Sequence, residues 1–179
     1  QNKRSVNPWF LETLPHVDGK LEMDEQAIRL GIQELIGEYA ECIDEDRLED
    51  WPELFTDPYK YLIISRSNHD AGMRQGVMYA ATKGMMLDRV LTIRQANLFE
   101  PHGYRHVVGP TRLKSVEDDV AIVHSHFIVA RIMHSGETVL FATGRYLDRI
   151  DVSTPDYRFK ERVVVLDSDQ IDTLLAIPL

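Results

Sequence analysis

The chain has 179 residues, of which 44% are apolar and 27% are charged, and its 29 Asp and Glu outnumber its 20 Lys and Arg to give a net charge of −9. This length can bury a core without disulfides. No apolar run reaches the ~20 residues that span a bilayer, which excludes an integral membrane protein. Residues 1–60 hold 15 acidic and 6 basic side chains, whereas residues 61–179 hold 14 of each. With no basic stripe, nucleic acid is not an expected partner.

Cysteine usage limits the redox chemistry that the chain can perform. Cys42 is the only cysteine, so no disulfide can form within the chain. A single cysteine is typical of the reducing cytoplasm, which is the expected location. Iron–sulfur clusters and Cys-rich zinc sites need two or more cysteines, so the chain cannot hold either alone.

Residues 1–23 are predicted to form an N-terminal arm, and residues 24–179 to form a single domain. Asp24 is typical of a helix N-cap, and the apolar residues after it recur at helical spacing. The helix is amphipathic, and its acidic side is interpreted as a solvated face. The apolar side comprises Ile28, Ile32, Leu35, Ile36, Tyr39 and Ile43, and the acidic side comprises Glu34, Glu38, Glu41 and Glu45. A short second helix is expected around Trp51, with Pro52 in its first turn.

The rest of the chain changes from helix to strand. Residues 59–64 are predicted to form a strand, and residues 70–97 a helix that Thr82 could cap, with Met86, Val90 and Ile93 on one face. Four β-type runs follow, separated by turn residues, at 104–116, 120–133, 138–150 and 157–166. Short links predict a meander, and runs this long must curl, with Gly109 and Gly144 as natural bends. The predicted fold class is α+β, with N-terminal helices packed in a strongly curved antiparallel sheet.

Two groups of histidines are candidate metal ligands. Glu100, His102 and His106 are the ligand types of non-haem iron oxygenases. Pro101 and Gly103 interrupt that group, however, so a loop that makes structural or interface hydrogen bonds is the favoured interpretation. His124 and His126 alternate on one face of a strand without a third ligand at clear spacing, which favours a solvent or subunit contact.

An acid–base site is a second possibility. Tyr39, Asp44, Asp46 and Asp50 could act as general acid and base at the mouth of a cone. The alternative is a solvated helix end, because perturbed pKa values need burial or a close charge. Cys42 is interpreted as inert packing.

Three segments carry a family resemblance. Residues 39–57 read YAECIDEDRLEDWPELFTD, residues 97–110 read NLFEPHGYRHVVGP, and residues 141–149 read FATGRYLDR. Together with the ending Ile177-Pro178-Leu179, they resemble the small (β) subunits of aromatic-ring-hydroxylating, Rieske non-haem iron dioxygenases. The benzoate-like, aromatic-acid branch is the most similar.

The resemblance implies a ketosteroid-isomerase-like or cystatin-like cone and a structural, non-catalytic subunit. It implies that the Rieske [2Fe–2S] cluster and the mononuclear Fe(II) belong to a large α subunit, with no cofactor in this chain. The subunits would form an α3β3 hexamer that receives NAD(P)H electrons from a reductase, in some systems through a ferredoxin. The second half of the chain favours Arg over Lys, which suits interfaces. The candidate partner contacts are Tyr104, Arg105, His106, Arg145, Tyr146 and Arg149.

Two other functions stay open at this point. The chain could be a free-standing isomerase or dehydratase of the same fold, with Tyr39, Asp44 or Asp46 in the cone, or a ligand-binding module. A buried carboxylate facing an open apolar pocket would favour these functions. A cone plugged by Trp51, Phe55 and methionine side chains would favour the scaffold. In the scaffold the helices are expected to face water and the sheet to face partners.

Overall fold

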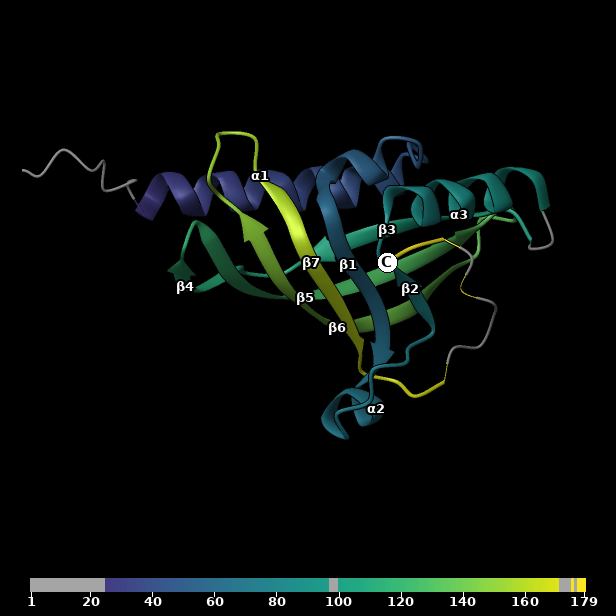
Figure 1. Cartoon of the computed structure of the whole chain (residues 1–179). Coiled ribbons are helices and arrows are strands. Elements are labelled where there is room, and N and C mark those ends of the chain that lie inside the picture. The colour runs from purple at the N-terminus through teal and green to yellow at the C-terminus, as the bar shows by residue number, and fades with distance from the viewer. Residues whose placement is uncertain (1–24, 97–99, 171–174, 176) are drawn as a thin grey trace, which may run out of the picture.

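The computed structural model describes residues 25–96, 100–170, 175 and 177–179. The predicted arm and the Asp24 cap lie outside these residues. Figure 1 shows the helices and strands in chain order, beginning with the long helix α1. The elements are α1 (Glu25–Asp44), the 3₁₀ turn η2 (Trp51–Leu54), β1 (Phe55–Ser65), α2 (Arg66–Asp70), β2 (Met78–Ala80), α3 (Lys83–Ala96), β3 (His102–Val108), β4 (Arg112–Glu117), β5 (Val120–Met133), β6 (Thr138–Asp151) and β7 (Arg158–Leu166).

The strands form one sheet in the order β2-β1-β7-β6-β5-β3, and β4 also pairs with β5. Strands β5, β6 and β7 form the predicted meander of antiparallel neighbours. The α+β fold class is confirmed, with one correction, because β1 and β7 are parallel and the sheet is therefore mixed. Hairpins join antiparallel neighbours only, whereas a parallel pair needs a long connection. Here that connection is the chain between Ser65 and Arg158.

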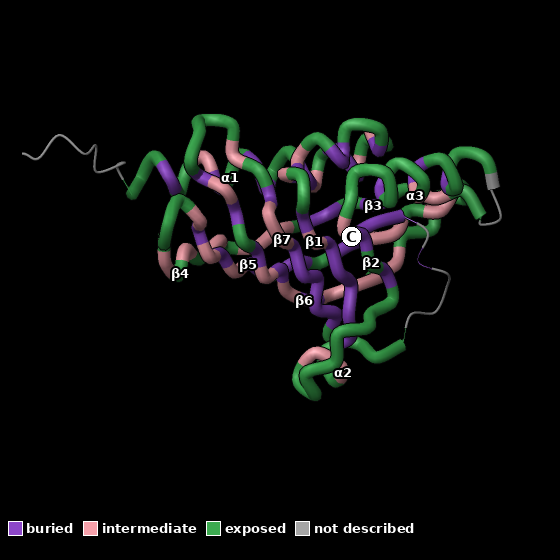
Figure 2. The backbone as a smooth tube through the Cα atoms, in the orientation of Figure 1, coloured by how far each residue is buried: buried purple, intermediate pink, exposed green. Residues whose placement is uncertain are grey.

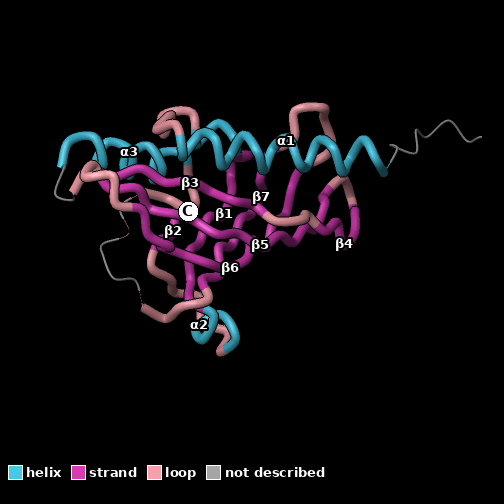
Figure 3. The backbone as a smooth tube through the Cα atoms, turned by 180° about the vertical axis from the view of Figure 1, so that it is seen from behind, coloured by secondary structure: helices cyan, strands magenta, loops and turns pink. Residues whose placement is uncertain are grey.

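The sheet curls around the helical layer. Helices α1 and α3 lie along the same side of the sheet, and α2 lies at the far end of β1 (Figures 1 and 3). The register of β6 shifts at Phe141 against β5, and that of β7 shifts at Lys160 against β6. Such bulges bend a strand and increase its twist. The buried residues lie mainly between the sheet and the two long helices (Figure 2).

The predicted faces of both long helices agree with their burial. All six apolar residues of the α1 face are buried, and Glu34, Glu38, Glu41 and Glu45 are exposed. Met86, Val90 and Ile93 of α3 are buried, and the Thr82 hydroxyl accepts a hydrogen bond from the Met85 N–H. The amphipathic pattern was therefore sufficient to orient α1, whereas α3 also exposes Met85, Leu87 and Leu91.

Two boundaries differ from the prediction. A single helix over residues 70–97 is wrong in its first half, where a turn and β2 precede α3. Two glycines explain why the helix does not begin at residue 70. Gly72 has φ +70°, and a Cβ on Gly76 would lie 2.0 Å from the Ile63 carbonyl oxygen. The run over residues 104–116 is two strands rather than one, because Gly109-Pro110 separates β3 from β4. Gly109 is thus a break, whereas Gly144 lies within the regular register of β6.

Candidate functional site

Aromatic side chains fill the interior of the cone. Trp51, Phe55 and Met86 are almost fully buried, with exposures of 1%, 3% and 0%. The Trp51 and Tyr61 rings meet edge to face at 5.1 Å, and the Phe55 and Phe159 rings lie 5.2 Å apart. Rings at these distances pack as a solid core. The interior of the cone is therefore filled with side chains, as expected of a scaffold.

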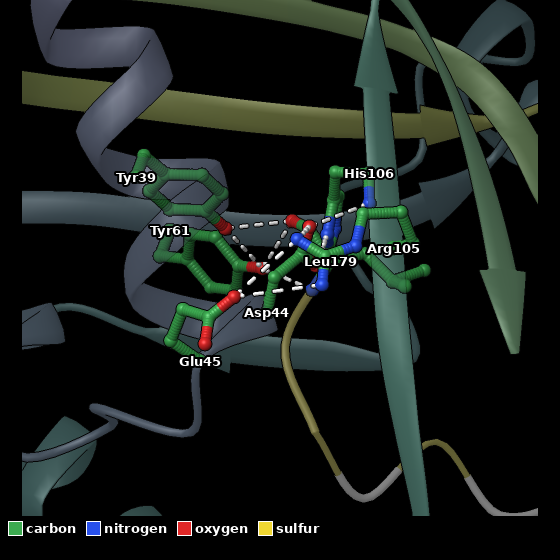
Figure 4. A network of polar contacts seen from close by, with 7 residues as sticks. All are labelled: Tyr39, Asp44, Glu45, Tyr61, Arg105, His106 and Leu179. Carbon is green, nitrogen blue, oxygen red and sulfur yellow. Dashed lines mark hydrogen bonds and ion pairs between the residues drawn. The ribbon is translucent and has the colours of Figure 1, made fainter. Parts of the chain in front are cut away.

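Leu179 contacts two tyrosines of this interior through its main chain (Figure 4). Its main-chain oxygen lies 2.6 Å from the Tyr39 hydroxyl and 3.0 Å from the Tyr61 hydroxyl, and its N–H donates to the Tyr61 hydroxyl at 3.2 Å. Leu179 itself is fully buried. Burial raises the pKa of Tyr39 to about 12 and that of Tyr61 well above its usual value. Both phenols therefore stay protonated at neutral pH and act as structural hydrogen-bonding groups.

A buried ion pair lies beside Tyr39. The Arg162 guanidinium donates two hydrogen bonds to the Asp148 carboxylate, at 2.9 and 2.8 Å, and both side chains have 0% exposure. The Arg162 Cζ lies 4.0 to 4.2 Å from the ring centroids of Tyr39, Tyr146 and Phe159. Burial raises the pKa of the Asp148 carboxyl, and the Arg162 charge opposes that rise. Three aromatic faces and a bidentate carboxylate thus hold the cation inside the core.

Asp44 ties the end of α1 to β3. Its carboxylate accepts hydrogen bonds from the His106 N–H at 2.8 Å and lies 2.6 Å from His106 Nδ1 (Figure 4). The Arg105 guanidinium lies next to this pair, 3.7 Å from the Asp44 carboxylate and 3.4 Å from the Glu45 carboxylate. Asp44 and His106 have nearly fully buried side chains. The Asp44–His106 pair therefore joins the end of α1 to β3.

The four acid–base candidates are not gathered into one site. Tyr39 and Asp44 are inside, whereas Asp46 pairs with Arg94 and Asp50 with Arg47 at the surface. Hollows of about 1180, 790 and 410 Å³ lie on the outer side of the sheet, between α1 and residues 155–158, and between β2 and α3. None of these three is lined by Tyr39, Asp44 or His106. The residues that the isomerase interpretation names, Tyr39, Asp44 and Asp46, therefore face none of these three hollows.

The metal candidates are also separated. His102 Nδ1 lies 2.7 Å from the Glu100 carbonyl oxygen, whereas His106 is engaged with Asp44. Among the described residues, no group of three or more His, Cys, Asp or Glu is placed to hold a metal ion. His124 and His126 lie on the outer side of β5, where burial lowers the pKa of His124. Cys42 is buried, and burial raises its pKa to about 11. A lone buried thiol does not fit the ligand set of a Rieske centre.

The six candidate contact residues divide between the two faces of the sheet. Tyr104, His106 and Tyr146 are buried and face the helices. Arg145 and Arg149 alternate with the inward residues of β6 and lie on the outer face. Arg105 alternates with Tyr104 and His106 on β3, at the edge of the sheet, and its guanidinium reaches Asp44 and Glu45 at the end of α1. Side chains alternate along a strand, so the period-two pattern could have separated the two sets. A partner can reach the three arginines without unfolding the core.

Sequence reasoning did not identify the Asp148–Arg162 pair. A signal was present, because Asp148 alternates in step with Tyr146 and Ile150, and the structure buries all three on one face of β6. A charged residue on such a face requires a buried partner. The sequence does not show which cation is that partner, because Asp148 meets Arg162 only through the pairing of β6 with β7.

Comparison with known proteins decides the family. The model of the ring hydroxylating beta subunit family matches residues 38–173. This chain belongs to that family. It is 41% identical over 141 residues to the terminal oxygenase component subunit beta 2 of terephthalate 1,2-dioxygenase from Comamonas sp., covering 79% of this chain and 92% of the relative. The predicted identity, a small subunit of an aromatic-ring dioxygenase, is confirmed.

Solved structures agree with the beta-subunit fold. A beta subunit assigned to an aromatic-ring-hydroxylating dioxygenase of Novosphingobium aromaticivorans superposes with a TM-score of 0.79 at 37% identity, covering 87% of this chain and 99% of that one. A protein from the same organism described as a scytalone dehydratase shares the fold alone, with a TM-score of 0.64 at 14% identity over 84% and 92% of the two chains. The predicted cone is therefore confirmed. No helix in the described part of this beta subunit is long and apolar enough to cross a membrane.

Proposed function

We propose that this beta subunit is a structural, non-catalytic part of a terminal oxygenase and holds large, iron-bearing α subunits in register within an α3β3 hexamer. The main observation behind this proposal is that side chains fill the interior of the cone. Trp51, Tyr61 and Leu179 are buried in its interior, and a substrate site needs an open cavity. Family membership supports the same role.

The redox centres are proposed to lie in the partner. The buried Cys42 cannot supply the two thiolates of a Rieske cluster. The [2Fe–2S] cluster and the mononuclear Fe(II) are therefore assigned to the α subunit. NAD(P)H electrons would reach that subunit through a reductase, with or without a ferredoxin. The cytoplasmic location stays a prediction.

An aromatic carboxylic acid is the proposed substrate class of the assembled oxygenase. The relative from Comamonas sp. is a subunit of a terephthalate dioxygenase, and terephthalate is an aromatic acid. The benzoate-like branch stays a prediction within this class. Substrate choice is assigned to the α subunit, because the interior of this beta subunit is filled.

Purification of the beta subunit with and without its large subunit tests this function. The large subunit is expected in an adjacent reading frame, recognisable by C-x-H and C-x-x-H segments. We expect a complex with iron bound by the large chain alone, and loss of ring hydroxylation when the beta subunit is omitted. Stoichiometric iron on the isolated beta subunit, or full activity of the large subunit alone, would contradict the proposal.

A further inference from the structure

The largest hollow of the described chain lies on the outer face of the sheet, between strands β1, β5, β6 and β7 and residues 69–79. Its volume is about 1180 Å³, and small-molecule sites commonly have volumes of ~300–1,000 Å³. One wall is the segment between α2 and β2. This segment is held to β1 by a hydrogen bond from the Val77 N–H to the Ile63 carbonyl oxygen at 2.7 Å. A single chain therefore builds the whole hollow.

The floor of the hollow is apolar. Leu62 and Ile64 of β1 and Val163 of β7 line it and belong to a buried cluster that is separate from the core inside the cone. Leu147 of β6 packs against this cluster. Leu62, Val163 and Leu147 are direct neighbours across the three strands. Such a surface favours the apolar body of a ligand, because contact removes apolar area from water.

Two arginines that line the hollow have no ion-pair partner among the described residues. Arg74 comes from the segment between α2 and β2. Arg149 comes from β6, where it lies two residues beyond Leu147 on the same face. A guanidinium binds a carboxylate through two parallel hydrogen bonds, which a lysine ammonium does not do. Both side chains are therefore available to bind an anion.

The carboxylates in and beside the hollow are already paired with other cations. These pairs are Glu161 with Lys60, Asp148 with Arg162, Asp151 with Lys160, Asp70 with Arg145 and Asp167 with Arg66. Glu161 is the direct cross-strand neighbour of Arg149, but its carboxylate lies 2.6 Å from Lys60 Nζ. With the buried Asp148–Arg162 pair neutral, the lining has three cations and one carboxylate. The hollow therefore carries net positive charge.

His124 supports this charge from another strand. It lines the hollow from β5 and is the direct neighbour of Leu147. Burial lowers the pKa of His124, and the positive charges of Lys114 and Arg145 lower it further, whereas Asp148 opposes them more weakly. An environment that disfavours an imidazolium favours an anion. The neutral ring can also donate or accept a hydrogen bond.

We propose that this hollow is a binding site for a small organic carboxylate with an apolar body. The body would lie on the floor formed by Leu62, Leu147 and Val163, and the carboxylate would accept hydrogen bonds from Arg74 or Arg149. The site is separate from the substrate site assigned to the large subunit, so the inference goes beyond the proposed function. It also gives Arg149, a predicted partner contact, a ligand in place of a protein.

Titration calorimetry of the full chain with 2-naphthoate tests the proposal. We expect saturable binding at one site. The uncharged 2-naphthamide should bind at least tenfold more weakly because it lacks the carboxylate, and inorganic phosphate because it lacks the apolar body.

A pair of arginine variants locates the site. Arg74→Gln/Arg149→Gln should weaken 2-naphthoate binding at least tenfold. Arg29→Gln/Arg158→Gln removes two exposed arginines that do not line the hollow, and it should leave binding unchanged. Both variants should melt within a few degrees of the wild type, because all four side chains are exposed.

Three results would overturn the proposal. The first is a wild-type chain that does not bind 2-naphthoate, or that binds 2-naphthamide equally well. The second is undiminished binding of 2-naphthoate by Arg74→Gln/Arg149→Gln. The third is a wild-type oligomer that Arg74→Gln/Arg149→Gln dissociates in sedimentation velocity, because a second copy would then occupy the hollow. The proposed function is tested by co-purification with the large subunit and stands or fails independently of all three.

Discussion

At the residue scale, the central feature is an arginine buried among aromatic rings. Arg162 contacts Tyr39, Tyr146 and Phe159 through its guanidinium and Asp148 through two hydrogen bonds. Removing one member of a buried ion pair leaves the other charge without compensation in a medium of low dielectric constant. The pair therefore contributes more through the cost of breaking it than through net attraction.

Substitution of Arg162 measures this cost. Arg162→Met should lower the free energy of unfolding by about 3–5 kcal/mol, because it leaves Asp148 unpaired. The double variant Asp148→Asn/Arg162→Met should lose less than the sum of the two single variants. Urea unfolding checks both, with the exposed Arg149→Met as a control expected within about 0.5 kcal/mol. Additive single effects would show that the two residues do not act as a pair.

At the scale of the element, close contacts between strands decide where glycine is required. A Cβ on Gly144 would lie 2.2 Å from the Val165 carbonyl oxygen and 3.0 Å from the Phe127 ring. Gly103 lies on β3, and a Cβ there would meet nothing within 4 Å. The sequence indicated a bend at Gly144, but the reason for glycine is the approach of β7 and Phe127.

Alanine at these two glycines gives a matched comparison. Gly144→Ala should destabilise the chain by about 1–3 kcal/mol, because the new methyl group must push β6 away from its neighbours. Gly103→Ala should change stability by less than about 0.5 kcal/mol. Thermal unfolding monitored by circular dichroism distinguishes them. Equal melting temperatures for the two variants would refute the proposed close packing at Gly144.

At the scale of the whole molecule, apolar residues inside the cone and those on the outer face of the sheet have different roles. Leu179 is fully buried against Tyr39 and Tyr61, whereas Leu140 is 67% exposed on the outer face of the sheet. The inner residue stabilises the fold, and the outer residue is free to serve an interface. Helix α1 thus presents an acidic surface, whereas the outer face of the sheet carries exposed apolar side chains and arginines.

Two leucine-to-alanine variants test this division. Leu179→Ala should lower the free energy of unfolding by about 2–5 kcal/mol, since it leaves a cavity in the core. Leu140→Ala should stay within about 0.5 kcal/mol of the wild type. Denaturant unfolding of the isolated beta subunit measures both. A large loss for Leu140→Ala would place this residue in the fold rather than on an interaction surface.

Local patterns were enough to predict much of the fold. The α1 face from Ile28 to Ile43, the β5 boundaries at Val120 and Met133 and the short turns of the meander all follow from periodicity and turn residues. Long strands also predicted a curled sheet. The segment between Asp70 and Thr82 did not follow the helical pattern, because the fit of Gly76 against β1 overrode local propensity.

The sequence by itself determined the family, the cone and the lack of a cysteine pair for a Rieske centre. Composition, spacing and side-chain periodicity are properties that can be read directly from the amino-acid sequence. Only the tertiary structure decided that β1 runs parallel to β7, that Arg162 finds Asp148, and that Leu179 fills the cone. These contacts join residues far apart in sequence, and their free energy depends on how the sheet curls around the helices, which no local pattern encodes.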